Sequence, residues 1–234
     1  MKPVIDQAVQ EAELFAQMGV DALIIENFRD IPFYPDRVPH ETVAAMSTIA
    51  REVVNRVDVP IGINVLRNDA DAALSIAAAV GAQFIRINVH NGAVLADQGV
   101  IQGKAYETLR KRKALNAQVM ILADVAVKHA APLANLSLEV EARDLSERSL
   151  ADALIVSGTG TGAETNFNDL KAVKDNTHLP VLIGSGVTPS NMRTLNSMAD
   201  GFIVGSYFKK DGKVTNEVDP TRVQEFVDIY RVIR

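Results

Sequence analysis

The sequence contains no cysteine, and this absence removes several kinds of chemistry. Disulfide bonds, thiolate nucleophiles and zinc sites built on cysteine are excluded. The four histidines do not have the spacing of a zinc site either. A chain without disulfides suits a reducing compartment, so we expect a cytoplasmic protein and leave peripheral association with a membrane open.

Long apolar runs and an excess of positive charge are also lacking. No apolar run reaches the roughly 18 residues of a membrane-spanning helix, and residues 1–6 lack the apolar stretch of a secretory signal. Lysine and arginine number 24 against 29 aspartates and glutamates, so no nucleic-acid partner is predicted. The basic run at 110–113 lies near a predicted helix end, where cations suit the helix dipole, and we interpret it as a solvated face.

Short apolar runs alternate with longer segments of helical periodicity along the chain. With 234 residues and 47% apolar content, residues 1–234 suit one globular α/β domain. The runs are rich in isoleucine and valine, which is typical of buried parallel strands. The predicted strands are 22–28, 61–66, 84–89, 119–125, 153–157, 181–183 and 202–204. Helix starts are marked at Thr188-Pro189 and Asp219-Pro220. Strands that alternate with helices predict a TIM-like (β/α)8 barrel.

We expect the barrel to lack its first strand, because eight helical patterns accompany seven strand patterns and the chain opens with a helix. An open barrel leaves a gap between strands 22–28 and 202–204. Three arrangements are compatible with the sequence: the gap stays open, residues 1–5 partly fill it, or another chain covers it. We expect a gap that is open or covered by a neighbour, which leaves a homo-oligomer open, because Pro3 lacks a backbone donor.

Long connections follow several predicted strands, at 29–39, 91–103 and 158–166. All of them leave the carboxyl ends of the strands, the face where barrel enzymes carry their active sites. Polar side chains also gather there. In the run 84–90 the polar residues fall on one face with a period of two. The residues that we expect to face the barrel axis are Glu26, Asn64, Arg86, Asn88, His90, Asp124 and Ser157.

Charged side chains at a barrel axis either pair with one another or face a ligand, and both interpretations stay open. If the chain remains extended to Lys128, then Asp124 and Lys128 share a face and could move protons, with Glu26 or His90 as a second acid or base. Asn64, Arg86, Asn88 and Ser157 would orient a substrate. We predict no cofactor and no metal site, although Glu26, His90 and Asp124 could together hold a magnesium or manganese ion.

Glycine-serine pairs follow the last two predicted strands. Gly184, Ser185 and Gly186 end one strand, and Gly205 and Ser206 end the next. Glycine lets backbone N–H groups approach an anion closely, and barrels commonly bind phosphate after their seventh and eighth strands. We therefore predict a phosphate site, and the alternative is tight turns that merely need glycine. The run 159–162 is no P-loop, because no Gly-Lys-Ser/Thr follows it.

Several runs resemble those of one known family over nearly the whole chain. They are Glu26-Asn27-Phe28, Asn64-Val65-Leu66-Arg67-Asn68-Asp69-Ala70, Asp97-Gln98-Gly99, Ala123-Asp124-Val125, Val127-Lys128-His129-Ala130, Ser157-Gly158 with Thr161-Gly162, and Gly184-Ser185-Gly186-Val187. The sequence resembles the BtpA family, which includes SgcQ-type proteins found beside sugar phosphotransferase genes. The resemblance implies a TIM-like barrel with phosphate-type anion binding. Cyanobacterial members are linked to photosystem I biogenesis and lie peripherally on thylakoids. Members usually begin with a Val-His-Leu-like strand and a Pro-Leu-Pro-Gly loop, which this sequence lacks.

Two functions follow from these residues and from the resemblance. The first is an enzyme, an isomerase, lyase or glycosidic-bond hydrolase, acting on a small phosphorylated metabolite such as a sugar phosphate or a nucleotide-like compound. The second is a non-catalytic photosystem I assembly factor peripheral to the thylakoid membrane. The second function predicts a vestigial phosphate site and a large exposed apolar patch outside the barrel mouth.

Overall fold

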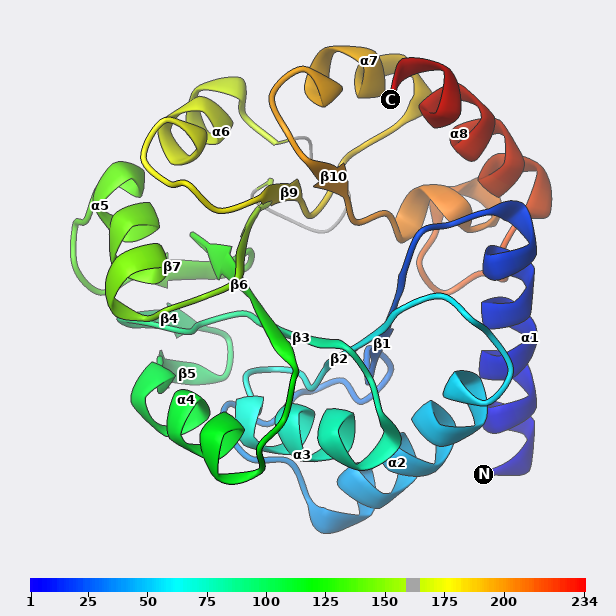
Figure 1. Ribbon diagram of the computed structural model, residues 1–234, viewed down its shortest axis with the longest axis horizontal. Coiled ribbons are helices and arrows are strands. Elements are labelled where there is room, and N and C mark those ends of the chain that lie inside the picture. Colours follow the sequence, from blue (N-terminus) through cyan, green and yellow to red (C-terminus); the bar gives the residue numbers. More distant parts are fainter. Residues whose placement is uncertain (159–164) are drawn as a thin grey trace.

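The computed structural model describes residues 1–158 and 165–234. Its main sheet is parallel throughout, with strand order β1-β2-β3-β6-β8-β9-β10. The sheet curls round a central axis and helices cover its outside (Figure 1). The strands are β1 (Leu23–Glu26), β2 (Ile61–Asn64), β3 (Phe84–Ile87), β6 (Met120–Val125), β8 (Ala153–Val156), β9 (Val181–Ile183) and β10 (Gly201–Phe202). The α/β fold and all seven predicted strands are confirmed.

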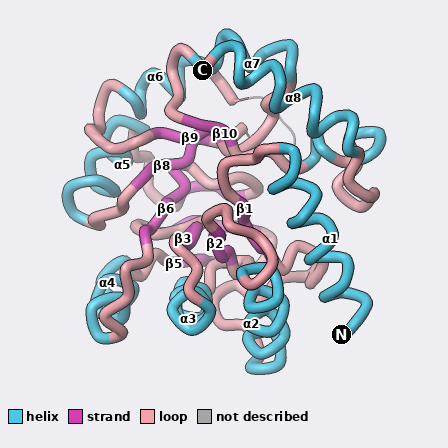
Figure 2. Tube along the Cα trace, turned by 45° about the vertical axis from the view of Figure 1, so that its right-hand side comes forward, coloured by secondary structure: helices cyan, strands magenta, loops and turns pink. Residues whose placement is uncertain are grey.

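Helices follow the strands in alternation and stand around the sheet (Figure 2). They are α1 (Lys2–Met18), α2 (His40–Val54), α3 (Ala70–Val80), α4 (Ala105–Ala114), α5 (Leu138–Arg143), α6 (Phe167–Lys174), α7 (Pro189–Asn196) and α8 (Pro220–Ile233). Shorter helical turns are η1 (Asp144–Arg148), η2 (Ser206–Phe208) and η3 (Lys210–Gly212). None of the helices in residues 1–158 and 165–234 is long and apolar enough to cross a membrane.

The predicted helix starts are confirmed by their capping bonds. Asp219 accepts a hydrogen bond from the Thr221 N–H, and Pro220 opens α8. Thr188 and Asn191 form a reciprocal capping box at the start of α7. Each cap satisfies N–H groups that the first helical turn leaves without partners, so these short polar signals determine where the two helices begin.

The gap predicted from the missing strand is present. Within the described residues, β1 pairs only with β2 and β10 pairs only with β9, so the two ends of the curled sheet face each other unpaired. Residues 2–5 belong to α1, so the arrangement in which the first five residues fill the gap as a strand is wrong. Helix α1 packs against α2 and α8 instead, on the outside of the gap.

A second sheet lies beside the barrel and was missed in the strand count. It is antiparallel with order β5-β4-β7, from β4 (Ala93–Ala96), β5 (Gly99–Gln102) and β7 (Ala130–Pro132). The predicted connection at 91–103 is therefore largely a hairpin. Val89, Ile101 and Val127 form a small buried cluster beneath it, which anchors the hairpin at the carboxyl ends of β3 and β6. The connection predicted at 158–166 lies mostly outside the described residues, as do Thr161 and Gly162.

Candidate active site

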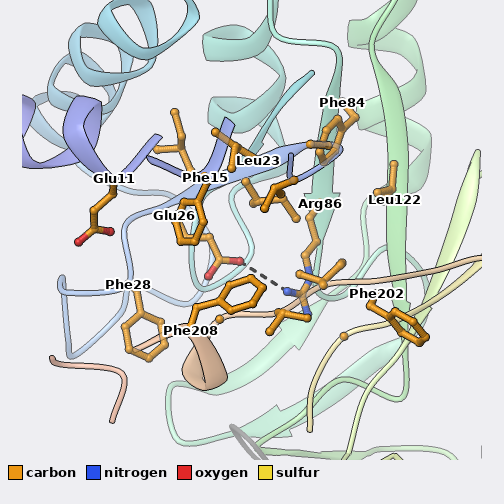
Figure 3. Close-up of a pocket in the computed structure, with 18 of the residues that line it drawn as sticks. Glu11, Phe15, Leu23, Glu26, Phe28, Phe84, Arg86, Leu122, Phe202 and Phe208 are labelled. Atoms are coloured by element: carbon orange, nitrogen blue, oxygen red, sulfur yellow. Dashed lines mark ion pairs between the residues drawn. The ribbon is translucent and has the colours of Figure 1, made fainter. Parts of the chain in front are cut away.

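A cavity of about 1880 Å³ opens at the gap between β1 and β10. Small-molecule sites usually measure about 300–1,000 Å³, so this cavity is larger than one metabolite requires. The cavity has two parts. The lower, apolar part is lined by residues such as Phe84 and Leu122, which are labelled in Figure 3. The upper part, at the carboxyl ends of the strands, is polar.

Arg86 is the centre of the polar part. Its Nε and Nη2 atoms donate to the two carboxylate oxygens of Asp124 over 3.0 and 3.1 Å. Its Nη1 atom lies 3.5 Å from Glu26 Oε1, the ion pair drawn in Figure 3. Burial alone would lower the pKa of Arg86, but Asp124 and Glu26 outweigh it and raise the pKa. The guanidinium therefore stays charged although its residue is only 6% exposed.

The two predicted asparagines complete this network. Asn88 Nδ2 donates to Asp124 Oδ2 over 2.7 Å, and Asn64 Nδ2 donates to Glu26 Oε1 over 2.8 Å. The structure thus brings together Glu26, Asn64, Arg86, Asn88 and Asp124 as the strand alternation predicts. The Asp124 side chain has no exposed surface, whereas that of Glu26 is 27% exposed and lines the cavity. Geometry favours an ion-pair role for Asp124 and leaves Glu26 accessible to a ligand.

Lys128 reaches the cavity by a route that strand periodicity does not predict. Strand β6 ends at Val125, and Ala126 has a φ of 50°, so the premise of an extended chain up to Lys128 is wrong. The side chain nevertheless lines the cavity, and its Nζ donates to the Gly184 carbonyl over 3.1 Å. Burial lowers the pKa of Lys128, and the nearby Arg86 lowers it further. A lysine with a lowered pKa is suited to proton transfer.

His90 does not join the other predicted residues. Strand β3 ends at Ile87, and the chain then bends, so the alternation that places Arg86 at the axis no longer holds at His90. Its Nε2 atom lies 2.9 Å from the Ser149 carbonyl oxygen, away from the cavity, and burial lowers its pKa. Glu26, His90 and Asp124 are therefore not gathered around one point. No group of three or more His, Cys, Asp or Glu side chains suited to a metal ion occurs in the part of the chain that the structure describes.

The glycine-serine pairs after β9 and β10 line the same cavity. Gly186 has a φ of 70°, a left-handed conformation that favours glycine. A Cβ on Gly184 would lie 2.4 Å from Ser157 Oγ, so packing requires glycine there. Ser185 Oγ accepts a hydrogen bond from the Gly158 N–H over 2.9 Å and joins the ends of β8 and β9. A Cβ on Gly205 would meet no atom of the described residues within 4 Å, so they leave space open beside it.

The remaining predicted residue, Ser157, lies beside the loop after β9. Its Oγ is buried and has no hydrogen-bond partner within the described residues. The two loops therefore differ. Gly184 is explained by packing against Ser157 and Ile155, as expected of a tight turn, whereas no packing contact with residues 1–158 or 165–234 explains Gly205. Open space beside a backbone turn is what close approach of an anion requires.

Arg67 was missed as a site residue. It is 8% exposed, and its Nη2 donates to the Lys128 carbonyl over 2.5 Å. Burial lowers the pKa of Arg67, while Asp124 raises it and Arg86 lowers it, so the guanidinium is electrostatically coupled to the network. Asn27 Oδ1 accepts a hydrogen bond from the Leu66 N–H over 2.7 Å and thereby holds this turn in place. Arg67 lies past the end of β2, where strand alternation carries no signal.

Comparison with known proteins finds a matching family. A family model described as the BtpA family matches residues 1–231. The photosystem I biogenesis protein BtpA of Synechocystis is 47% identical over 226 residues, which cover 96% of this chain and 79% of that protein.

Solved structures with the same fold are TIM-barrel-like. Thiamine phosphate pyrophosphorylase from Pyrococcus furiosus has a TM-score of 0.64 at 16% identity, covering 96% of this chain and 90% of that one. N-(5'-phosphoribosyl)anthranilate isomerase from the same organism has a TM-score of 0.63 at 19% identity, covering 97% and 96%. At such low identity the likeness concerns the fold, which is a (β/α) barrel that lacks one strand.

Proposed function

This chain belongs to the BtpA family, and from that premise we propose that it is an enzyme acting on a small phosphorylated metabolite. The observation that carries the proposal is a convergence in one cavity. The glycine-serine pairs after β9 and β10 line the same space as the Arg86 network and Lys128. Anion-binding backbone beside a buried cation and a lysine of lowered pKa is typical of a catalytic site.

The phosphate would lie against Gly184, Ser185 and Gly186 on one side and Gly205 and Ser206 on the other. The open space beside Gly205 supports this placement. Lys128 adds positive charge, because its Nζ reaches the Gly184 carbonyl. The solved barrels named above, a thiamine phosphate pyrophosphorylase and a phosphoribosylanthranilate isomerase, have phosphorylated compounds in their names, and this agrees with a phosphate site on this fold.

Lys128 and Glu26 are the residues that we assign to proton transfer. Both line the cavity, and both lie beside Arg86. Asp124 and the two asparagines hold Arg86 and Glu26 in place, so that Arg86 can orient a substrate. An acid and a base in one cavity suit an isomerase, a lyase or a glycosidic-bond hydrolase acting on a sugar phosphate or a nucleotide-like compound.

A thermal-shift screen against phosphate esters tests the proposal. A ligand that binds only the folded chain raises the midpoint by mass action, so inorganic phosphate or a sugar phosphate at millimolar concentration is expected to raise the midpoint of wild type. Gly205→Asp places a carboxylate in the open space and is expected to abolish the shift while the fold survives. Gly205→Asn is the control of matched size without charge. If no phosphate ester shifts wild type, the site does not bind phosphate.

The second candidate is a non-catalytic assembly role, which the name of the Synechocystis relative suggests. One observation favours it. Leu95 and Val100 lie directly opposite each other in the β4–β5 hairpin and are 52% and 60% exposed. Exposed apolar side chains on one face are typical of a surface that contacts another protein or a membrane. Loss of binding to a partner in a Leu95→Lys variant that keeps its phosphate response would support this role.

A further inference from the structure

Two lysines of the described residues line the cavity, and they differ in their partners. Lys209 Nζ donates to Glu11 Oε2 over 3.0 Å, so a carboxylate holds its ammonium. Lys128 Nζ donates to the neutral Gly184 carbonyl over 3.1 Å. No carboxylate in residues 1–158 and 165–234 lies within 4.0 Å of the Lys128 Nζ. The charged form of Lys128 therefore lacks the ion pair that stabilises the Lys209 ammonium.

The surroundings of Lys128 favour its neutral amine. Burial lowers the pKa of Lys128, the Arg86 guanidinium lowers it further, and together they outweigh Asp124 and Glu26, which raise it. Lysines that are desolvated or lie next to another cation are the ones that act as nucleophiles. A neutral amine has one N–H donor fewer than an ammonium and gains a lone pair. It can keep its hydrogen bond to the Gly184 carbonyl and still use the lone pair for attack.

The backbone that carries Lys128 is held on both sides. The Ala126 N–H donates to Glu141 Oε1 over 3.2 Å, at the left-handed residue that follows β6. Arg67 Nη2 donates to the Lys128 carbonyl over 2.5 Å. A reacting group that is already oriented loses little conformational freedom when its substrate binds. The turn therefore places the amine in the cavity before a ligand arrives.

The position of the amine also bears on the kind of substrate. Lys128 Nζ lies against Gly184, in the loop to which we assign the phosphate. A phosphorylated ligand bound at that loop brings the carbons next to its ester within reach of the amine. Glu26 lines the same cavity, and its side chain is 27% exposed. A nucleophilic amine with an acid–base group in the same cavity is suited to attack on a carbonyl.

We propose that Lys128 forms an imine with a phosphorylated ketone or aldehyde. The inference rests on the proposed phosphate site and narrows its substrate class. An iminium withdraws electrons from the bonds next to the former carbonyl carbon, so that a proton or a carbon fragment can leave. This chemistry selects an isomerase or a lyase over a glycosidic-bond hydrolase.

The step balances in atoms and charge. The ammonium first releases a proton, and the amine lone pair then forms a bond to the carbonyl carbon. A proton passes from nitrogen to the carbonyl oxygen, which gives a carbinolamine. The released proton returns to that oxygen, the carbon–oxygen bond breaks, and water leaves as the carbon–nitrogen double bond forms. One ammonium and one carbonyl thus give one iminium and one water, and Glu26 is the group that we assign to these proton transfers.

Reductive trapping on wild type tests the imine. The protein is incubated with sodium cyanoborohydride and either dihydroxyacetone phosphate or ribulose 5-phosphate, then digested and mapped by mass spectrometry. Cyanoborohydride reduces an imine to a stable secondary amine, so at least one of the two ketones is expected to leave a single adduct on Lys128. Glycerol 3-phosphate lacks the carbonyl and dihydroxyacetone lacks the phosphate, and both are expected to leave Lys128 unmodified.

Lys128→Arg keeps the positive charge without an amine and is expected to lose the adduct, whereas Lys209→Arg, the matched control in the same cavity, retains it. Adducts spread equally over Lys128 and other lysines would overturn the proposal. A thermal shift by both ketones without any adduct would overturn the imine and leave the phosphate site standing. Absence of a shift by every phosphate ester would overturn the proposed function itself. Peptide mapping of wild type decides between these outcomes even if Lys128→Arg does not fold.

Discussion

At the scale of single residues, the hydrogen bonds and burial of Asp124 favour a structural role over a catalytic one. Its carboxylate accepts three hydrogen bonds, two from Arg86 and one from Asn88, and its side chain has no exposed surface. An acid or base in turnover must reach a substrate proton. These contacts make Asp124 a partner that holds and orients the Arg86 guanidinium.

Asp124→Asn is expected to lower the free energy of unfolding by about 3–5 kcal/mol, because it leaves Arg86 buried with a weakened partner set. Urea unfolding measures this. Glu26→Gln is the matched control, since Glu26 is partly exposed and lies farther from Arg86, and its cost is expected to stay below about 1 kcal/mol. Near-normal stability of Asp124→Asn together with lost turnover would instead return Asp124 to proton transfer.

Lys128 and His90 show how position beyond a strand end changes a prediction. Lys128 reaches the cavity although the chain turns at Ala126, and His90 bonds to the Ser149 carbonyl although it has the parity of Arg86. Both residues lie after the last paired residue of their strands. At these two positions backbone turns, not alternation, determine where the side chains lie.

At the scale of elements, the loops after β9 and β10 each contain a glycine, and we attribute the two glycines to different causes. A Cβ on Gly184 would overlap Ser157 Oγ and Ile155 Cγ2, at 2.4 and 2.7 Å, whereas a Cβ on Gly205 would touch none of the residues that the structure describes. The first glycine belongs to the packing between β8 and β9. The second leaves room at the surface of the cavity, where we place the phosphate.

Gly184→Ala is therefore expected to destabilise the chain by about 1–3 kcal/mol, the usual cost of overpacking. Gly205 has a negative φ, and a Cβ there would lie more than 4 Å from every described neighbour, so the effect of Gly205→Ala on the free energy of unfolding is expected to lie within about 0.5 kcal/mol. Denaturant unfolding of the two variants side by side makes the measurement. An equal loss in both would mean that Gly205 is also needed for the turn, and would weaken the phosphate site.

At the scale of the whole molecule, the barrel is open between β1 and β10. The edges are unpaired within the described residues, and apolar side chains line the gap. Unpaired edges exchange hydrogen readily and can pair with other chains. The gap also explains why the cavity is larger than a metabolite site. The lower part of the cavity is barrel core that a further strand would cover.

Amide hydrogen exchange tests the open edge within a single strand. The Leu23 N–H bonds to the Pro60 carbonyl over 2.9 Å, so alternation points the Ile24 N–H toward the gap. In a dilute monomer Ile24 is expected to exchange fast and Leu23 slowly. Slow exchange at Ile24 in a demonstrably monomeric sample would mean that the edge is covered. Protection of Ile24 that grows with protein concentration would indicate that a second copy covers it.

The sequence by itself determined the seven parallel strands, the missing strand and the inward direction of Arg86 and Asp124. Apolar runs mark buried strands, and a period of two assigns each side chain within a strand to one face. The hairpin of β4 and β5 was not predicted, because each strand is only four residues long and apolar residues lie on both of its faces.

Only the tertiary structure decided the rest of the site. It brought Arg67 and Lys128 to the network, removed His90 from it and separated the roles of Gly184 and Gly205. The physical reason is common to all of them. These residues lie beyond strand ends, where no periodic pattern applies, and their surroundings come from segments far away in the chain: Arg67 and Lys128 are 61 residues apart, and Lys128 and Gly184 are 56 apart.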